Sequence, residues 1–137
     1  MAWHHLPLRA LRSLLAFTIA GIALVALSGA GGEAAPWVGL PRGGDLRLGW
    51  DLAWLGAGGI LAFALVARLA PCAPRGHALG LLAILLAAGL WAVATMGGDF
   101  PAWFCAGLVG LLPLQCWLGL RLARSTPSAL GKRRTAR

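Results

Sequence analysis

The feature that most constrains this chain is a series of long stretches without charged residues. Between Asp99 and Arg121 lie 21 consecutive uncharged residues, residues 78–98 form a second run of 21, and residues 13–32 form a run of 20. At about 1.5 Å of rise per residue, a helix of this length crosses the roughly 30 Å hydrocarbon core of a bilayer. The pattern therefore predicts membrane-spanning helices.

The composition agrees with this prediction. Hydrophobic residues make up 59% of the chain and charged residues only 12%, whereas soluble domains carry about 25% charged residues. We predict an all-α integral membrane protein, a four-helix transmembrane bundle built from two antiparallel hairpins. Its expected spans are at about 13–32, 50–69, 78–98 and 100–122, in a single domain 13–124 that lies between a leader (1–12) and a basic tail (125–137).

The first span has a second interpretation. Arg9 and Arg12, the apolar stretch 14–27 and the small residues 28–30 also fit a secretory signal peptide. The apolar run is at the long end for a signal sequence, and cleavage would leave three helices. We therefore favour a retained helix.

The connection between the first two spans is rich in Gly, Pro and mixed charge. Residues 31–49 are predicted to form turns with no regular element. Tryptophans and acids near the span ends are expected at the outer membrane interface, because the indole ring is apolar while its N–H needs a partner. These expected interface residues are Trp50, Asp51, Trp54, Asp99 and Trp103.

The distribution of charge predicts the orientation. With a cytoplasmic N-terminus and four crossings, ten of the twelve Lys and Arg residues face the cytoplasm, and only Arg42 and Arg47 lie outside. All four acids then lie outside. Lys and Arg are enriched in cytoplasmic segments near span ends, so we expect both termini to be cytoplasmic.

The basic residues do not suggest a nucleic-acid binder, although the formal net charge is +8. They cluster at the ends of apolar runs, whereas nucleic-acid binders gather them on one polar face. The tail residues are instead expected to contact anionic lipid. They are Lys132, Arg133, Arg134 and Arg137.

No set of residues typical of catalysis is found. The spans contain no Asp, Glu, Lys or Arg in their interior, which disfavours a proton-coupled carrier. Cys105 and Cys116 are roughly 16 Å apart along one helix, too far to form a disulfide, and Cys72 falls in a turn expected on the cytoplasmic side. We predict no catalytic, cofactor or metal site.

The fourth span carries the residues most informative about packing. Pro113 removes a backbone donor and is expected to kink the helix. Gln115 is the most polar side chain in any span, and its amide is expected to bind a neighbouring helix, although it can also mark a ligand or gating site. A stripe of small residues, expected to allow close helix packing, comprises Ala102, Ala106 and Gly110.

These observations predict a small non-enzymatic multi-pass protein of the cell (inner) membrane. It is expected to act through helix–helix or lipid contacts as an accessory or structural subunit. Its expected partners are the bilayer and either another copy or another membrane protein. The alternative is an oligomeric transporter or permeation pathway for a small uncharged solute; a membrane enzyme is the least favoured class.

Overall fold

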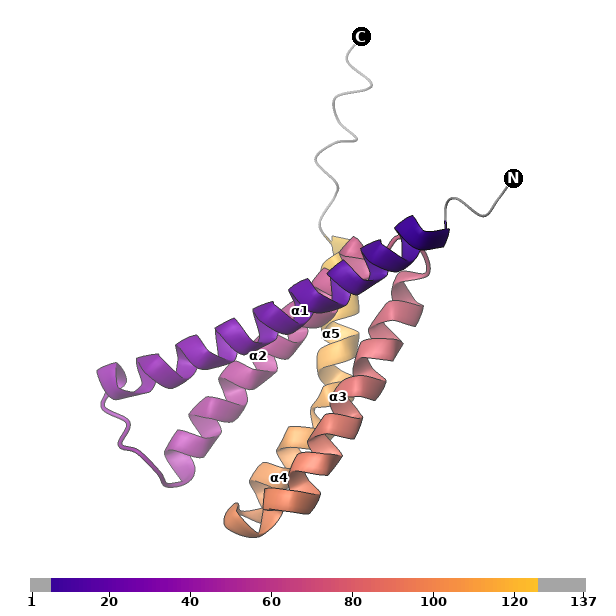
Figure 1. Ribbon diagram of the computed structural model, residues 1–137. Helices are drawn as coiled ribbons and strands as arrows, with labels where there is room; N and C mark the ends of the chain where they lie inside the picture. Colours follow the sequence, from indigo (N-terminus) through magenta and orange to yellow (C-terminus); the bar gives the residue numbers. More distant parts are fainter. Residues whose placement is uncertain (1–5, 126–137) are drawn as a thin grey trace.

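The computed structural model describes residues 6–125 and is all-helical, with no strand in that range. Four helical segments are long and apolar enough to cross a membrane, which confirms this part of the prediction. The elements in chain order are α1 (Leu6–Ala34), η2 (Ala35–Val38), α2 (Asp45–Leu69), α3 (Pro74–Met96), η3 (Gly97–Asp99), α4 (Ala102–Gly110) and α5 (Leu112–Ser125). The start of α1 and the end of α5 lie at the same end of the molecule (Figure 1).

Prolines and glycines set the limits of the helices. Ala73 has a left-handed backbone (φ 44°), a conformation unfavourable for a residue with a Cβ, and it separates α2 from α3. Pro74 then begins α3, where its missing N–H costs nothing. Gly43 and Gly44 both have positive φ (87° and 84°) and precede the first residue of α2. The chain can reverse direction there only because these two residues lack side chains.

The prediction that residues 31–49 contain no regular element is wrong. Helix α1 continues to Ala34, η2 follows, and α2 already begins at Asp45. The carbonyl of Gly32 would normally accept the N–H of residue 36, but Pro36 has none. Arg47 replaces that donor, since its Nη2 lies 3.1 Å from the Gly32 oxygen. A side chain of α2 thus supplies the hydrogen-bond donor that the Gly32 carbonyl lacks in the last turn of α1.

Helix α2 is the centre of the bundle and packs mainly against α1 and α5. Its buried residues lie in its second half, from Gly58 to Ala67, and include Phe63 and Val66, which are fully buried. The other helices contribute mostly small residues to this core, namely Ala16, Ala20, Ala78, Leu81 and Cys116.

Glycines allow the helices around α2 to approach closely. A Cβ added at Gly119 of α5 would lie 2.7 Å from the Ile60 carbonyl oxygen and 3.0 Å from the Ala64 nitrogen. On the opposite side, a Cβ at Gly58 would lie 3.1 Å from the carbonyl oxygen of Leu24 in α1. Close backbone contact of this kind is typical of membrane helices. In lipid the hydrophobic effect does not drive helices together, so their association depends on close van der Waals packing.

The fourth span is divided in two. Helix α4 ends at Gly110, and α5 begins at Leu112, with Leu111 between them. The division falls just before Pro113, which cannot donate to the carbonyl of Val109. The span is therefore interrupted in its middle, where the sequence predicts a kink.

Large apolar side chains on α1 and α3 point away from the bundle. Val25 is 71% exposed and Trp91 is 73% exposed in the single chain. Each span contains a most apolar stretch. In the segments that contain α1 and α3, 11% of the residues of this stretch are buried, whereas in α2 the buried share is 39%. Apolar surface of this extent requires a lipid or protein cover.

Candidate functional site

The charged residues of the described chain lie near the two ends of its long helices, whose arrangement is drawn in Figure 1. The end formed by the connections 39–44 and 97–101 is called the acid end here, because all four acidic residues of the chain lie near it: Glu33, Asp45, Asp51 and Asp99. The opposite end, formed by the turn 70–73, the start of α1 and the end of α5, is called the arginine end. It carries Arg9, Arg12, Arg68, Arg75, Arg121 and Arg124.

At the acid end, polar groups join α1 to α2. Arg47 Nε lies 3.0 Å from Asp51 Oδ2, one turn further along α2, and its Nη2 binds the carbonyl of Gly32. Trp50 Nε1 donates to the carbonyl of Gly31 at 2.7 Å. These contacts pair Arg47 with Asp51 and supply donors to the carbonyls of Gly31 and Gly32 at the end of α1.

The residues predicted for the outer interface all lie at this end, in different environments. Trp50 and Trp54 are partly buried, with ring centroids 5.9 Å apart, and Trp54 packs against Gly31. They therefore hold α1 and α2 together. Trp103 is 43% exposed, with its ring edge-to-face on Phe104, and Asp99 is exposed.

A cavity of about 530 Å³ opens at the acid end between α1 and α2. Both signs of charge line it, from Glu33, Arg42, Arg47 and Asp51. Two of these four groups already form the ion pair described above. The cavity thus has no excess of one charge with which to select an ion.

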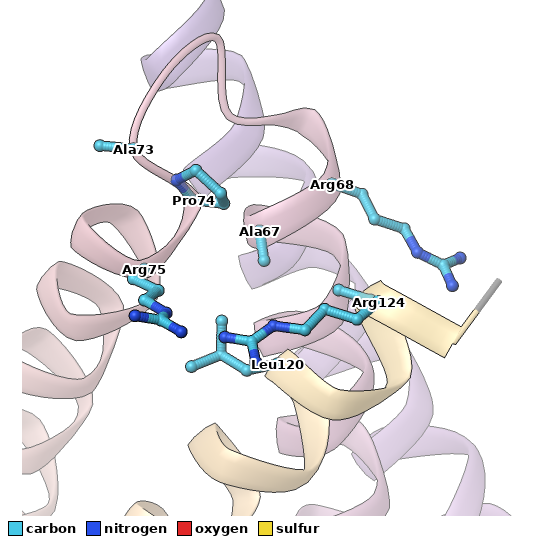
Figure 2. Close-up of a pocket in the computed structure, with 8 residues that line it drawn as sticks. Ala67, Arg68, Ala73, Pro74, Arg75, Leu120 and Arg124 are labelled. Carbon is cyan, nitrogen blue, oxygen red and sulfur yellow. The ribbon is translucent and has the colours of Figure 1, made fainter. Parts of the chain in front are cut away.

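A second cavity, of about 570 Å³, lies at the arginine end between α2, α3 and α5. Its lining is apolar apart from three arginines: Ala67, Arg68, Ala73, Pro74, Arg75, Leu120, Ala123 and Arg124. Figure 2 shows the side chains of Arg75 and Arg124 extending toward one another over Leu120, whereas Arg68 points away. Arg68 Nη2 donates to the Leu122 carbonyl at 2.9 Å and thereby joins α2 to α5.

Gln115 is buried, with 5% exposure, on the face of α5 that meets α2. Its amide lies against Gly59, where an added Cβ would come within 2.8 Å of its Cδ, and near Gly56. Within residues 6–125 the amide makes no hydrogen bond to a protein group. The contact is therefore close packing of an amide on a glycine, whereas the sequence predicts a hydrogen bond between helices.

The predicted stripe of small residues does not form the packing face of α4. Ala102, Ala106 and Gly110 are exposed, and Pro113 is exposed on α5. Gly107 of α4 lies against Leu52 of α2. Small residues recur on more than one face of α4, so their spacing alone does not identify the face in contact.

The cysteines and the histidine within residues 6–125 make structural contacts within and between helices. All three cysteines are free, with Cys72 exposed and Cys116 buried. His77 Nε2 lies 2.9 Å from Ser13 Oγ, and its ring stacks on Phe17, which fastens α3 to α1. In the described range, no three His, Cys, Asp or Glu side chains gather in a metal-binding group.

The basic tail residues predicted to contact lipid, Lys132, Arg133, Arg134 and Arg137, lie outside the described residues.

Comparisons with protein-family models, curated proteins and solved structures found no match to this chain. The functional argument therefore depends on the geometry alone.

Some important residues were not singled out by their sequence pattern. Gly59 and Gly119 support the contact between α2 and α5, and the Gly58–Gly59 pair was the available signal. For Arg75 and Arg124 the sequence predicts only a contribution to the orientation of the chain in the membrane, because nothing in it indicates that the two side chains face one another.

Proposed function

We propose that this chain is a small multi-pass protein of the cell (inner) membrane that acts through helix–helix or lipid contacts as an accessory or structural subunit. In this proposal, two antiparallel hairpins place the arginine end in the cytoplasm and the acid end outside. The distribution of Lys and Arg supports that orientation.

The outward apolar faces of α1 and α3 are the observation that carries the proposal. Both helices expose large side chains along much of their length, among them Leu14, Val25, Ile84 and Leu90. The exposed small residues Ala102, Ala106 and Gly110 of α4 offer a surface on which another helix can pack closely. An accessory subunit needs such uncovered surface.

The proposal is tested by photo-crosslinking in cells, followed by purification in mild detergent. A photoreactive amino acid is placed at Leu90, which is 57% exposed on α3, and, as the matched control, at Leu81 of the same helix, which is buried in the core. We expect a discrete protein adduct from position 90 and from equivalent outward positions of α1 or α4. Position 81 is expected to react only within the chain.

A different result would favour the transporter hypothesis. If no outward position gives a protein adduct, and the purified chain alone moves a small uncharged solute across liposomes, the accessory role is contradicted. Gln115→Leu then becomes informative, because a residue lining a permeation path would stop transport without changing stability.

A further inference from the structure

The arginine end contains a charge arrangement that the protein does not neutralise. Arg75 of α3 and Arg124 of α5 extend toward one another across the 570 Å³ cavity (Figure 2). Within residues 6–125 neither guanidinium forms an ion pair or donates a hydrogen bond. Both side chains are exposed, and an anion bound between them would lower the repulsion of their like charges.

No acidic side chain of this chain is near enough to be that anion. All four acids lie near the acid end, across the length of the bundle (Figure 1). At the acid end itself, Arg47 is paired with Asp51. An anion that binds Arg75 and Arg124 would therefore come from outside the described protein.

The start of α3 adds to the positive potential. Pro74 and Arg75 form the first turn of this 23-residue helix, and both line the cavity. No side chain caps the helix start at Ala73. The N-terminal end of a helix carries partial positive charge and unpaired N–H groups, which favour phosphate and other anions.

The rest of the cavity is apolar. Apart from its three arginines it is lined by apolar residues, among them Ala67, Leu120 and Ala123. A cavity lined by two guanidinium groups and by apolar side chains, at the end of a membrane-length bundle, fits a ligand in which a phosphate adjoins hydrocarbon. Guanidinium groups bind phosphate oxygens in a bidentate manner, and basic pockets between membrane helices bind anionic headgroups.

We propose that this cavity is a binding site for the phosphate headgroup of an anionic phospholipid. Arg75 and Arg124 hold the phosphate from two helices, and the start of α3 contributes its N–H groups. Arg68 has a different role, because it is bound to the Leu122 carbonyl and joins α2 to α5. The inference deepens the proposed lipid contacts and rests on the proposed membrane location.

Native mass spectrometry of the full chain in detergent tests the site. The protein is titrated with phosphatidylglycerol, with phosphatidylcholine and, as a soluble source of the same chemistry, with inorganic phosphate. The test variant is Arg75→Gln/Arg124→Gln. The matched control is Arg9→Gln/Arg121→Gln, which removes the same charge from the same end but outside the cavity; Arg121 lies over the Trp117 ring.

We expect phosphatidylglycerol to bind in preference to phosphatidylcholine. The cavity variant should bind phosphatidylglycerol about thirtyfold more weakly, corresponding to about 1 kcal/mol for each arginine. The control should change the affinity less than about threefold. Arg75→Lys should retain part of the affinity, because it keeps the charge and loses the fork of donors.

Three results would overturn the site. Equal weakening in the cavity and control variants would indicate general surface charge. Equal affinity for inorganic phosphate would indicate a soluble anion as the ligand. Equal binding of both lipids would remove the headgroup preference.

If the double variant does not fold, the single variants Arg75→Gln and Arg75→Lys are compared with the unchanged protein in the same titrations. Release of the protein from membranes without detergent would instead overturn the proposed location.

Discussion

The two ends of the bundle satisfy their charges in different ways. At the acid end, Arg47 is bound to Asp51 and to the carbonyl of Gly32, so α1 and α2 are joined by polar contacts within the chain. At the arginine end, the helices are joined mainly by a close-packed core around Phe63 and Val66. There, Arg75 and Arg124 face a cavity without a protein anion.

The difference indicates that the two ends depend on different physical terms. Close approach of helix backbones around Gly58 and Gly119 is the main contact toward the arginine end, whereas hydrogen bonds from Arg47 and Trp50 and the packing of Trp54 on Gly31 join α1 to α2 at the acid end. At the acid end the cation Arg47 has its anion within the chain, while Arg75 and Arg124 at the arginine end have none in the described residues. Changes that affect one end without the other can break or sharpen this comparison.

The largest effect is expected from Gly119→Leu. The new side chain would collide with the backbone of Ile60 and Ala64, which cannot move aside without separating α5 from α2. Overpacking of this kind costs about 2–3 kcal/mol of unfolding free energy. Reversible unfolding in mixed micelles measures it. Gly110→Leu is the control, because a Cβ at Gly110 has no neighbour within 4 Å and should change the stability little.

A smaller effect is expected from Arg47→Gln at the acid end. The change removes the ion pair with Asp51 and the donor to the Gly32 carbonyl, and about 1–2 kcal/mol should be lost. Hydrogen exchange should accelerate in the last turn of α1 and stay unchanged around Phe63. Arg42→Gln removes the same charge from the same cavity and should leave exchange unaltered. Acceleration at Phe63 would show that the two ends are not independent.

A still smaller effect is expected from Gln115→Leu. Its amide packs on Gly59 without a hydrogen bond to protein, so the change should cost less than about 1 kcal/mol. Unfolding in micelles measures the stability, and crosslinking from position 90 reports on partner binding. A loss of partner binding at unchanged stability would identify Gln115 as part of a functional site.

The sequence was sufficient for the spans because hydrophobic length is a local property. The runs 78–98 and 100–120 predict helices without any knowledge of their neighbours. The end of α1 was missed because its last turn is completed by Arg47, fifteen residues away in the sequence. The local pattern of Gly and Pro near the end of α1 indicates only that helix formation is unfavourable there.

The candidate site was less predictable for the same reason. Gln115 was recognisable as a polar residue in an apolar span, but its partner Gly59 depends on how α5 is rotated against α2. The same rotation places Gly107 of α4 against Leu52 and leaves Ala106 exposed in the single chain. Likewise, only the tertiary arrangement brings Arg75 and Arg124 to one cavity.

Labelling with a membrane-impermeant maleimide tests the central claim, that the chain crosses the membrane with its arginine end in the cytoplasm. Cys72, exposed in the turn after α2, reports on the arginine end when Cys105 and Cys116 are replaced by Ala. Pro41→Cys, at an exposed position before α2, reports on the acid end when the three native cysteines are replaced. In intact cells we predict labelling of Pro41→Cys, with Cys72 labelled only after the membrane is permeabilised. Labelling of Cys72 in intact cells would contradict the account.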